Sequence, residues 1–214
     1  MIVGVPRETK TEEHRVGLTP SGARELVKAG HQVLVESGAG YPDDNFAAAG
    51  AELLSSAAQV WERSELISKV KEPQPAEYQF LRPGLTLFCY LHLAPLPELT
   101  RTLLKSRVNA IALETIQTDE GFLPCLMPMS EIAGRMSVQI GSYYLMRDHG
   151  GPGILLGGVP GVPPCEVLVL GAGTAGMNAG RVAAGMGALV RIMDVNLARL
   201  AQLDNIFDGR ILTV

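Results

Sequence analysis

The sequence has no excess of positive charge, and this removes two classes of partner from consideration. Its 214 residues carry a formal net charge of −4 and a pI of about 5.6. Lys and Arg number 18 against 22 Asp and Glu, and they form no long basic run. Proteins that bind nucleic acid or anionic membranes through charge need a positive face. We therefore expect no nucleic-acid partner and no membrane partner.

Cysteine is also scarce. The three cysteines stand far apart, at positions 89, 125 and 165, and none belongs to a C-x-x-C pair. This spacing indicates neither a disulfide framework nor a zinc site, and it fits a reducing cytosol. No signal peptide precedes the charged segment after Val5, and no apolar run approaches the roughly 20 residues that span a bilayer. The sequence predicts a cytoplasmic protein that holds no metal.

Phosphate-binding P-loops, nucleophile elbows and internal repeats are absent as well, and what remains is an alternation of strands and helices. With 47% apolar and 19% charged residues, the chain has the composition of a globular protein with a sizeable core. We predict strands at residues 2–5, 31–36, 66–70, 85–91 and 108–113, and helices at residues 20–29, 43–49, 56–63 and 97–106. Such alternation implies a parallel sheet. Residues 1–129 are predicted to form one domain of the flavodoxin-like α/β class.

A second domain is predicted from residue 130 onward. Ser130 is expected to cap a long helix that reaches about residue 146. The helix places apolar residues on one face at every fourth position: Ile132, Met136, Ile140 and Tyr144. Such a helix could bridge two domains. The Gly- and Pro-dense residues 150–164 then predict an ordered loop without regular structure.

The most informative stretch combines a strand, a glycine turn, a helix and a second strand. The strand Glu166–Leu170 leads into a G-x-G-x-x-G set: Gly171, Ala172, Gly173, Thr174, Ala175 and Gly176. A helix over 177–186 and a strand over 189–193 follow. In a dinucleotide-binding fold the first glycine allows the tight turn, the second lets the backbone approach a pyrophosphate, and the third lets the helix pack near the strand. The pyrophosphate binds at the helix N-terminus, where backbone N–H groups are unpaired.

The residue after the second strand specifies the dinucleotide further. Asp194 lies about 18 residues after Gly176, close to the roughly 20 found in NAD-binding folds, where an acidic residue binds the adenosine ribose. A carboxylate there repels the 2′-phosphate of NADP, so NAD is predicted, although Arg191 and Arg199 keep that preference from being absolute. The competing interpretation is a plain α/β turn whose glycines serve only packing. The strand, the helix, the spacing and the acidic residue all agree with a dinucleotide-binding turn, so the packing interpretation is the weaker one.

Ligands of open parallel sheets bind beyond the carboxyl ends of the strands, and four polar residues are predicted at that edge. They follow four different strands: Arg15, Lys71, His92 and Glu114. Arg15 suits a carboxylate because its planar fork matches two oxygens, and Lys71 suits a substrate oxygen. His92 is the candidate acid or base, since an imidazole exchanges protons near neutral pH. Glu114 is expected to orient one of them or to accept a loop N–H.

Each of these residues has an ordinary structural alternative. Arg15 would be a solvated loop charge, Lys71 a strand-end lysine that extends to solvent, and His92 a structural histidine. Their shared position at one edge favours a site. Cys89 lies in an apolar strand and is expected to be inert core. The other histidines have no comparable context and are expected at the surface: His14, His31 and His149.

Several longer segments resemble one known family. They are GVPRETKTEEHRVGLTP near the start, KVKEP around Lys71, YLHLA around His92, LPCLMPMSEIAGR around Ser130, LLGGVPGVPP and VLGAGTAGMNA. With the rest of the chain they are similar to alanine dehydrogenase, and also to the related N-terminal NAD-binding part of proton-translocating transhydrogenase. The resemblance covers essentially the whole sequence.

The resemblance implies NAD-dependent, reversible oxidative deamination of L-alanine to pyruvate and ammonia. By this resemblance residues 1–129 form the substrate domain and residues 130–214 the NAD-binding Rossmann domain. Arg15 and Lys71 are implied to bind the carboxylate and carbonyl oxygens of pyruvate, and His92 and Lys71 to be catalytic. Cofactor contacts are implied at Ser130, at the six turn residues, and at Asp194 and Arg199. The resemblance also implies a homo-oligomer, often a hexamer in the family.

Members of this family are longer, which leads to a further expectation. The sequence stops at Val214, within what would be the third strand of the nucleotide domain, so residues 130–214 correspond to the first of two mononucleotide halves. We expect a C-terminally truncated form that lacks the family's catalytic aspartate, exposes an apolar sheet edge and is impaired in catalysis. Two alternatives stay open: the NAD-binding component of transhydrogenase, and a non-catalytic remnant that binds NAD or AMP.

Overall fold

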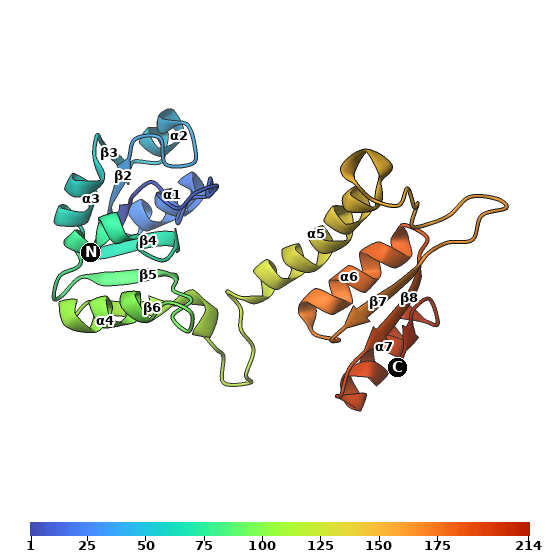
Figure 1. Ribbon diagram of the computed structural model, residues 1–214. Coiled ribbons are helices and arrows are strands. Elements are labelled where there is room, and N and C mark those ends of the chain that lie inside the picture. The colour runs from blue at the N-terminus through green and yellow to red at the C-terminus, as the bar shows by residue number, and fades with distance from the viewer. The chain divides into compact units, whose positions relative to one another are not determined.

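The computed structural model describes residues 1–214, and these form two compact units. The first spans residues 1–121 and the second residues 122–214, and Figure 1 shows strands and helices in each. The predicted boundary after residue 129 lies inside the helix α5, Met127–Leu145. The whole of α5 therefore belongs to the second unit.

A six-stranded parallel sheet forms the centre of the first unit. Its strands are β1 (Ile2–Val5), β2 (Gln32–Glu36), β3 (Glu52–Leu54), β4 (Leu66–Lys71), β5 (Thr86–Tyr90) and β6 (Asn109–Ala112). They are hydrogen-bonded in the order β3-β2-β1-β4-β5-β6, and every pair is parallel. Without β3 this is the order of flavodoxin-like folds, which confirms the predicted class. The sequence pattern misses β3, because three residues at a sheet edge are too few to show a period.

Helices connect these strands, and one short helix follows the last strand. They are α1 (Pro20–Lys28), α2 (Asp43–Ala48), α3 (Ala57–Arg63), α4 (Pro97–Ser106) and the short 3-10 helices η1 (Pro75–Phe80) and η2 (Leu113–Thr115). The start predicted for α1 is confirmed, since Thr19 Oγ1 accepts the Gly22 N–H at 3.2 Å and Pro20 opens the helix. Proline suits that position because the N–H it lacks would have no partner there.

Both faces of the first unit's sheet are covered. Along β2, Val33 and Val35 on one face and Leu34 on the other are each at most 1% exposed. Val33 and Val35 pack in a cluster that includes residues of α1 and α2. A second cluster joins β4 and β5 to α3 and α4 around Trp61 and Leu99. Continuous apolar strands of this kind are typical of parallel sheets that are buried on both sides.

The second unit contains a three-stranded parallel sheet, ordered β7-β8-β9. Its elements are α5, the 3-10 helix η3 (Arg147–His149), β7 (Glu166–Leu170), α6 (Thr174–Gly185), β8 (Leu189–Met193), α7 (Leu197–Phe207) and β9 (Leu212–Thr213). Ile192 of β8 and Leu203 of α7 are fully buried in its core. Residues 150–164 hold no helix or strand, as predicted, apart from an isolated bridge between Val159 and Val162.

The start of α5 differs from the prediction, and its apolar face is not the face that is buried. The helix begins at Met127 with Leu126 at the cap position, so Ser130 lies within the first turn and does not cap it. Pro128 explains the earlier start, because proline is tolerated only in a helix's first turn. The side of α5 that is buried carries Gly134 and Val138. The apolar face that the sequence singles out stays between 48% and 63% exposed: Ile132, Met136, Ile140 and Tyr144.

Candidate functional site

Four polar residues lie at the carboxyl-terminal edge of the first unit's sheet. Arg15 follows β1, Lys71 ends β4, His92 follows β5, and Glu114 lies in η2 after β6. Because β1, β4, β5 and β6 are consecutive parallel strands of the sheet, the structure brings all four predicted residues to one edge. Open parallel sheets bind their ligands at this edge.

His92 has a strained backbone that Glu114 holds in place. Its φ is 47°, in the left-handed region that residues other than glycine seldom occupy. The Glu114 carboxylate accepts the backbone N–H of Leu91 at 3.1 Å and that of His92 at 2.7 Å. The His92 ring stacks on Tyr90 with the centroids 6.3 Å apart. Strain of this kind collects at functional sites, and Glu114 accepts loop N–H groups as predicted.

The strand end that carries Lys71 is fixed by a buried cluster of charges. The Lys69 side chain is 0% exposed, and its Nζ lies 3.1 Å from a Glu8 oxygen and 2.9 Å from a Glu77 oxygen. Glu8 also accepts the backbone N–H of Val70 at 2.6 Å and that of Lys71 at 3.4 Å. Burial alone would lower the pKa of Lys69, but the charges of Glu77 and Glu8 outweigh it and hold that pKa above its usual value. A charged ammonium therefore ties two carboxylates to β4.

Arg15 is held by a carboxylate of its own loop. Glu13 accepts the Arg15 Nε–H at 2.8 Å and an Nη2–H at 2.6 Å, and it also accepts the Arg15 backbone N–H at 2.9 Å. The hydrogen bonds from Arg15 lower the pKa of Glu13 to about 2. A cavity of about 480 Å³ opens beside this pair and is also lined by Glu8 and Gly40.

The loop that carries Arg15 runs directly against β4. Ser68 Oγ donates a hydrogen bond to the Gly17 carbonyl at 2.9 Å. A Cβ at Gly17 would lie 2.4 Å from the Ser68 carbonyl oxygen, so only glycine allows this approach. Nearer the start of the loop, Lys10 Nζ lies 2.5 Å from a carboxylate oxygen of the buried Glu72. These contacts fix the loop on the strand that carries Lys71.

Sequence predictions also concern one cysteine and three further histidines, of which His14 lines the same cavity as Arg15. Cys89 is fully buried, and burial raises the pKa of its thiol, so it is an inert core residue as predicted. His14 is exposed and His31 partly exposed. His149, in the second unit, is exposed and stacks on Tyr143 with centroids 3.6 Å apart.

Four residues of this edge escape sequence reasoning: Glu8, Glu13, Lys69 and Glu77. One signal was available for Lys69, because alternation along β4 places it on the same face as the buried Ile67. A lysine in the middle of a strand that is covered on both faces has to be buried and paired. No such signal exists for Glu8 and Glu13, since a charged loop has no period that separates buried carboxylates from solvated ones.

In the second unit, each of the three glycines of the G-x-G-x-x-G turn is suited to its position for a different structural reason. Gly171 has a φ of 99°, a conformation that glycine adopts without strain. A Cβ at Gly176 would lie 1.8 Å from the Gly171 carbonyl oxygen, so α6 packs directly on the turn. A Cβ at Gly173, the cap of α6, would meet nothing within 4 Å. The Gly173 backbone is therefore open to a ligand rather than packed against protein.

Asp194 and Arg199 both hold the turn at Ala172. Asp194 accepts the Ala172 N–H at 2.6 Å and the Asn196 N–H at 2.8 Å, and these backbone hydrogen bonds lower its pKa. Arg199 Nε donates to the Ala172 carbonyl at 2.8 Å. Asp194 also lines a cavity of about 360 Å³. An ionised carboxylate with lone pairs to spare and an open Gly173 fit the adenosine end of a dinucleotide.

The start of α5 reaches the same turn. A Cβ at Gly134 would lie 2.1 Å from the carbonyl oxygen of Ala175, so the two helices touch where α6 begins. Ser130 lies about one helical turn before Gly134. Arg135 Nε donates to the buried Asn178 at 3.1 Å, and Asn178 in turn donates to the Thr174 carbonyl at 2.9 Å. The predicted cofactor residue Ser130 thus lies on a helix that packs against the glycine turn.

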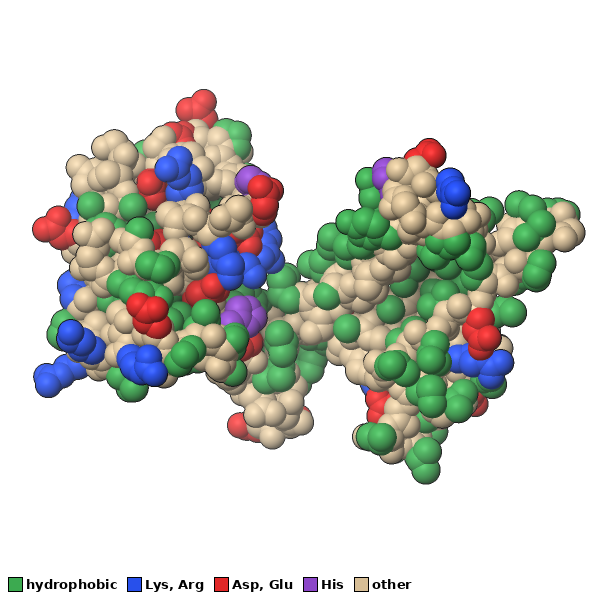
Figure 2. Space-filling model, in the orientation of Figure 1, with side chains coloured by type: hydrophobic (Ala, Val, Ile, Leu, Met, Phe, Trp, Pro, Cys, Tyr) green, Lys and Arg blue, Asp and Glu red, His purple; other side chains and the backbone are tan.

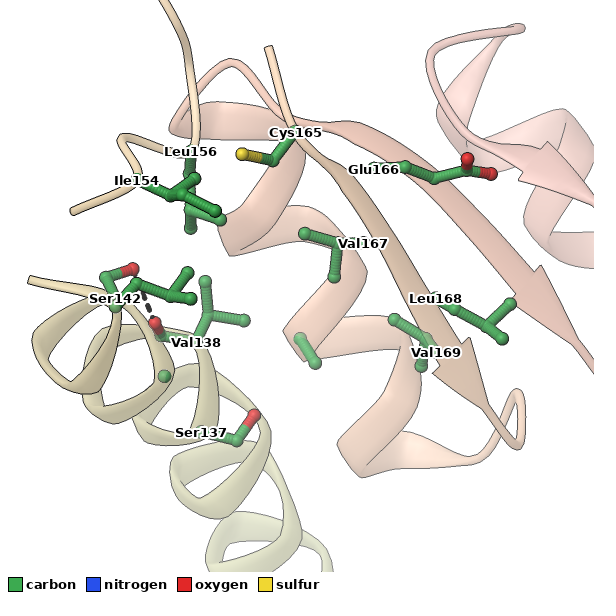
Figure 3. A pocket seen from close by; sticks show the side chains of 13 residues that line it. Ser137, Val138, Ser142, Ile154, Leu156, Cys165, Glu166, Val167, Leu168 and Val169 are labelled. Atoms are coloured by element: carbon green, nitrogen blue, oxygen red, sulfur yellow. Dashed lines mark hydrogen bonds between the residues drawn. The ribbon is translucent and has the colours of Figure 1, made fainter. Parts of the chain in front are cut away.

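A groove with few polar side chains follows β7 on its outer edge. It has a volume of about 550 Å³ and lies between β7, α5, α6 and the segment around Leu156. Figure 3 shows Val167 directed into this groove, whereas the Glu166 carboxylate points away from it. Its few polar side chains are Ser137, Ser142, Cys165 and Glu166. The groove therefore offers packing surface and lacks the groups that would direct chemistry.

Comparison with known proteins accounts for both units. Residues 4–133 match the family model of the alanine dehydrogenase/PNT N-terminal domain, and residues 137–214 match that of the C-terminal domain. The chain belongs to the alanine dehydrogenase/PNT family. It is 55% identical over 217 residues to alanine dehydrogenase of Mycolicibacterium smegmatis, covering 100% of this chain and 58% of that protein. The chain thus spans somewhat more than half the length of the curated relatives it matches.

Solved structures agree with this family membership. An L-alanine dehydrogenase with 48% sequence identity matches with a TM-score of 0.94, over 100% of this chain and 60% of the other. A transhydrogenase from Sinorhizobium meliloti matches with a TM-score of 0.82 over 100% of this chain and 61% of the other, and its 24% identity shows a shared fold. None of the helices is long and apolar enough to cross a membrane.

Proposed function

We propose that this chain carries the substrate-binding and adenosine-binding sites of an NAD-dependent alanine dehydrogenase. The observation that carries the proposal is the position of Arg15, Lys71 and His92 at the carboxyl ends of β1, β4 and β5, three adjacent strands. Membership of the alanine dehydrogenase/PNT family supports the same function. The reaction is the reversible oxidative deamination of L-alanine to pyruvate and ammonia.

The chemistry of the edge fits a small 2-oxo acid. The planar guanidinium of Arg15 matches a carboxylate, with two parallel hydrogen bonds. The Lys71 ammonium offers three donors on a flexible stem, which suits the carbonyl oxygen next to that carboxylate. His92 is the group that exchanges protons with the oxygen or nitrogen on the reacting carbon. NAD, when bound, accepts the hydride from the Cα of alanine.

Binding of pyruvate by the purified chain tests the substrate site without relying on turnover. We expect calorimetric titration to detect pyruvate binding, and Arg15→Lys to weaken it about tenfold because the two-pronged contact is lost. The control is Arg101→Lys, which changes an exposed arginine on α4. The substrate assignment is wrong if the unaltered chain does not bind pyruvate, or if both variants bind it equally well.

NAD binding tests the second site in the same way. We expect the chain to bind NAD and AMP more tightly than NADP, because the Asp194 carboxylate accepts ribose hydroxyls and repels a 2′-phosphate. Asp194→Asn should weaken NAD binding and narrow its margin over NADP. Asp204→Asn, an exposed position on α7, is the matched control. Equal affinity of the unaltered chain for NAD and NADP would argue against the adenosine site.

A steady-state assay with L-alanine and NAD separates the remaining alternatives. We expect a polypeptide of residues 1–214 to bind both ligands, and the assay measures whether it also turns them over. Binding of NAD without binding of pyruvate would instead identify a non-catalytic nucleotide-binding protein. Turnover at ordinary enzymatic rates would show that this length suffices for the reaction.

The proposal has two further parts, which are that the protein forms a homo-oligomer and that it works in a reducing compartment. The exposed apolar side chains on α5, Ile132, Met136 and Ile140, support formation of a homo-oligomer. Three free cysteines support a reducing environment such as the cytoplasm. Light scattering of the purified chain measures its oligomeric state, and a monomer at all concentrations would contradict the proposed homo-oligomer.

A further inference from the structure

Glu13 stands out among the residues of the sheet edge because it contacts Arg15 at three points. Its carboxylate accepts the Arg15 Nε–H at 2.8 Å, an Nη2–H at 2.6 Å and the backbone N–H at 2.9 Å. A single side chain therefore fixes Arg15 at both ends, at its main chain and at its guanidinium. Two of these bonds are charge-assisted and parallel, which is the geometry of strong arginine–carboxylate pairs.

The two partners differ in how far they are buried. The Glu13 side chain is 7% exposed, whereas that of Arg15 is 51% exposed. Glu13 is thus the fixed member of the pair, and Arg15 is the member that reaches into solvent beside the 480 Å³ cavity. An arginine on a loop has about 2 kcal/mol of rotamer entropy to lose when a ligand orders it. A buried carboxylate that orders the guanidinium beforehand removes much of that loss.

The charges around Glu13 agree with this arrangement. Its pKa is lowered to about 2, first by the side-chain hydrogen bond from Arg15 and to a smaller extent by the charge of Lys71. The carboxylate therefore stays ionised at every working pH. The Lys71 charge also reaches Glu13, although Arg15 is the cation that it contacts.

We propose that Glu13 is a positioning residue, which orients the Arg15 guanidinium for the carboxylate of the substrate. This inference rests on the proposed function and adds to it a residue that does not touch the substrate. Glu13 contacts the guanidinium through Nε and Nη2. The alternative is that Glu13 competes with the substrate for Arg15, and the two roles predict opposite changes in affinity.

Two substitutions at Glu13 separate orientation from charge. Glu13→Gln keeps the length of the side chain and removes its charge, whereas Glu13→Asp keeps the charge and shortens the reach. We expect each to weaken pyruvate binding about tenfold, the effect of losing a charge-assisted contact. Tighter binding by Glu13→Gln would show that Glu13 competes with the substrate, and affinity equal to that of the unaltered chain would show no role. Either result overturns the proposal.

A double-mutant cycle shows whether Glu13 acts through Arg15. In the Arg15→Lys background a lysine cannot form the two-pronged contact, so adding Glu13→Gln should change pyruvate affinity by less than twofold. A full tenfold effect in that background would overturn the proposal. Glu25→Gln is the control, since it removes a carboxylate that pairs with Lys28 on the exposed face of α1. It should leave pyruvate affinity unchanged.

A readout without substrate distinguishes failure of this inference from failure of the proposed function. The Nε–H resonance of Arg15 in nitrogen-15 NMR should be protected from solvent exchange in the unaltered chain and lose that protection in Glu13→Gln. Fluorescence of Trp61 during thermal unfolding confirms that each variant is folded. If the unaltered chain shows the protected resonance but does not bind pyruvate, the proposed function fails and the substrate role of Glu13 fails with it. If it binds pyruvate and Glu13→Gln binds equally well, only the inference about Glu13 fails.

Discussion

The two parallel sheets of this protein differ in how they are covered. In the first unit, three consecutive residues of β2, Val33–Val35, are buried on alternating faces. In the second unit, burial along β8 alternates strictly, with Val190 and Ile192 buried and the other three residues of the strand exposed. Figure 2 shows apolar side chains over much of the visible surface of the second unit and charged side chains scattered over the first. One sheet is covered on both sides and the other on one.

The exposed face of the second sheet carries large apolar side chains around one ion pair, between Glu166 and Arg191. The apolar side chains come from all three strands: Leu168, Leu170, Leu189, Met193 and Leu212, each between 41% and 77% exposed. A parallel sheet normally carries helices on both faces, and α6 and α7 pack on the opposite face, around Ile192. Strands rich in Val, Ile and Leu therefore form a sheet that is buried on both faces in the first unit. In the second unit they form a sheet with one face exposed, which we call the open face.

The largest expected effect comes from breaking the buried charges of the covered sheet. Lys69→Met leaves the carboxylates of Glu8 and Glu77 buried without their cation, which should destabilise the first unit by about 3–5 kcal/mol. Urea unfolding followed by the fluorescence of Trp61, the single tryptophan, measures this unit alone. Lys28→Met on the exposed face of α1 is the control and should change stability by less than about 0.5 kcal/mol. Equal effects of the two variants would mean that the buried cluster does not stabilise the fold.

The second-largest effect is expected from substitutions in the glycine turn between β7 and α6. Gly176→Ala places a Cβ against the Gly171 carbonyl, and relief of that overlap should cost about 1–3 kcal/mol in the second unit. Gly173→Ala has room for its Cβ and a φ of −66°, so the fold should be unaffected and only NAD binding weakened. Hydrogen exchange of the α6 and β8 amides measures stability, and calorimetry measures NAD binding. Unchanged NAD affinity in Gly173→Ala would contradict close approach of the pyrophosphate.

Much of the covered unit is predictable from local pattern. The start of α1 follows from Thr19 and Pro20, and the positions of Lys71 and His92 follow from the rule that parallel strands end at one edge. The same rule could not place Glu13, because its burial depends on how the loop folds back onto the Arg15 side chain. Such contacts arise only when distant segments meet, and no spacing in the sequence encodes them.

Helix α5 of the second unit shows what a periodic pattern leaves undecided. Ile132, Met136 and Ile140 recur at helical spacing, yet they are about half exposed, while Gly134 and Val138 face the protein. Hydrophobic periodicity identifies a helix and its apolar stripe but does not say which element covers that stripe. Ser130 failed as a cap for a different reason, since Pro128 already marks the first turn. The proline is visible in the sequence, and it indicates the start of the helix more strongly than the serine two residues later.

A smaller effect concerns the pH dependence of the charged edge. The pKa of Glu13 is about 2 in the folded chain against 4.5 ordinarily, so its contribution is complete above pH 4.5 and is lost as the pH falls toward 2. Because Arg15 is half exposed, we expect this contribution to be about 1 kcal/mol or less. The difference in unfolding free energy between the unaltered chain and Glu13→Gln should shrink as the pH falls from 5 to 2. A constant difference over that range would show that the pair does not stabilise the loop.

The smallest effect on stability should accompany a clear change in association. Leu168 is 53% exposed on the uncovered face of β7, so Leu168→Lys adds a charge where little packing is lost and should change stability by less than about 0.5 kcal/mol. An apolar patch drives association, and the added charge should lower both self-association in light scattering and the fluorescence of a bound hydrophobic dye. Leu104→Lys is the control, because Leu104 on α4 is 75% exposed in the covered unit. If both variants lower association equally, the open face of the second sheet has no special part in it.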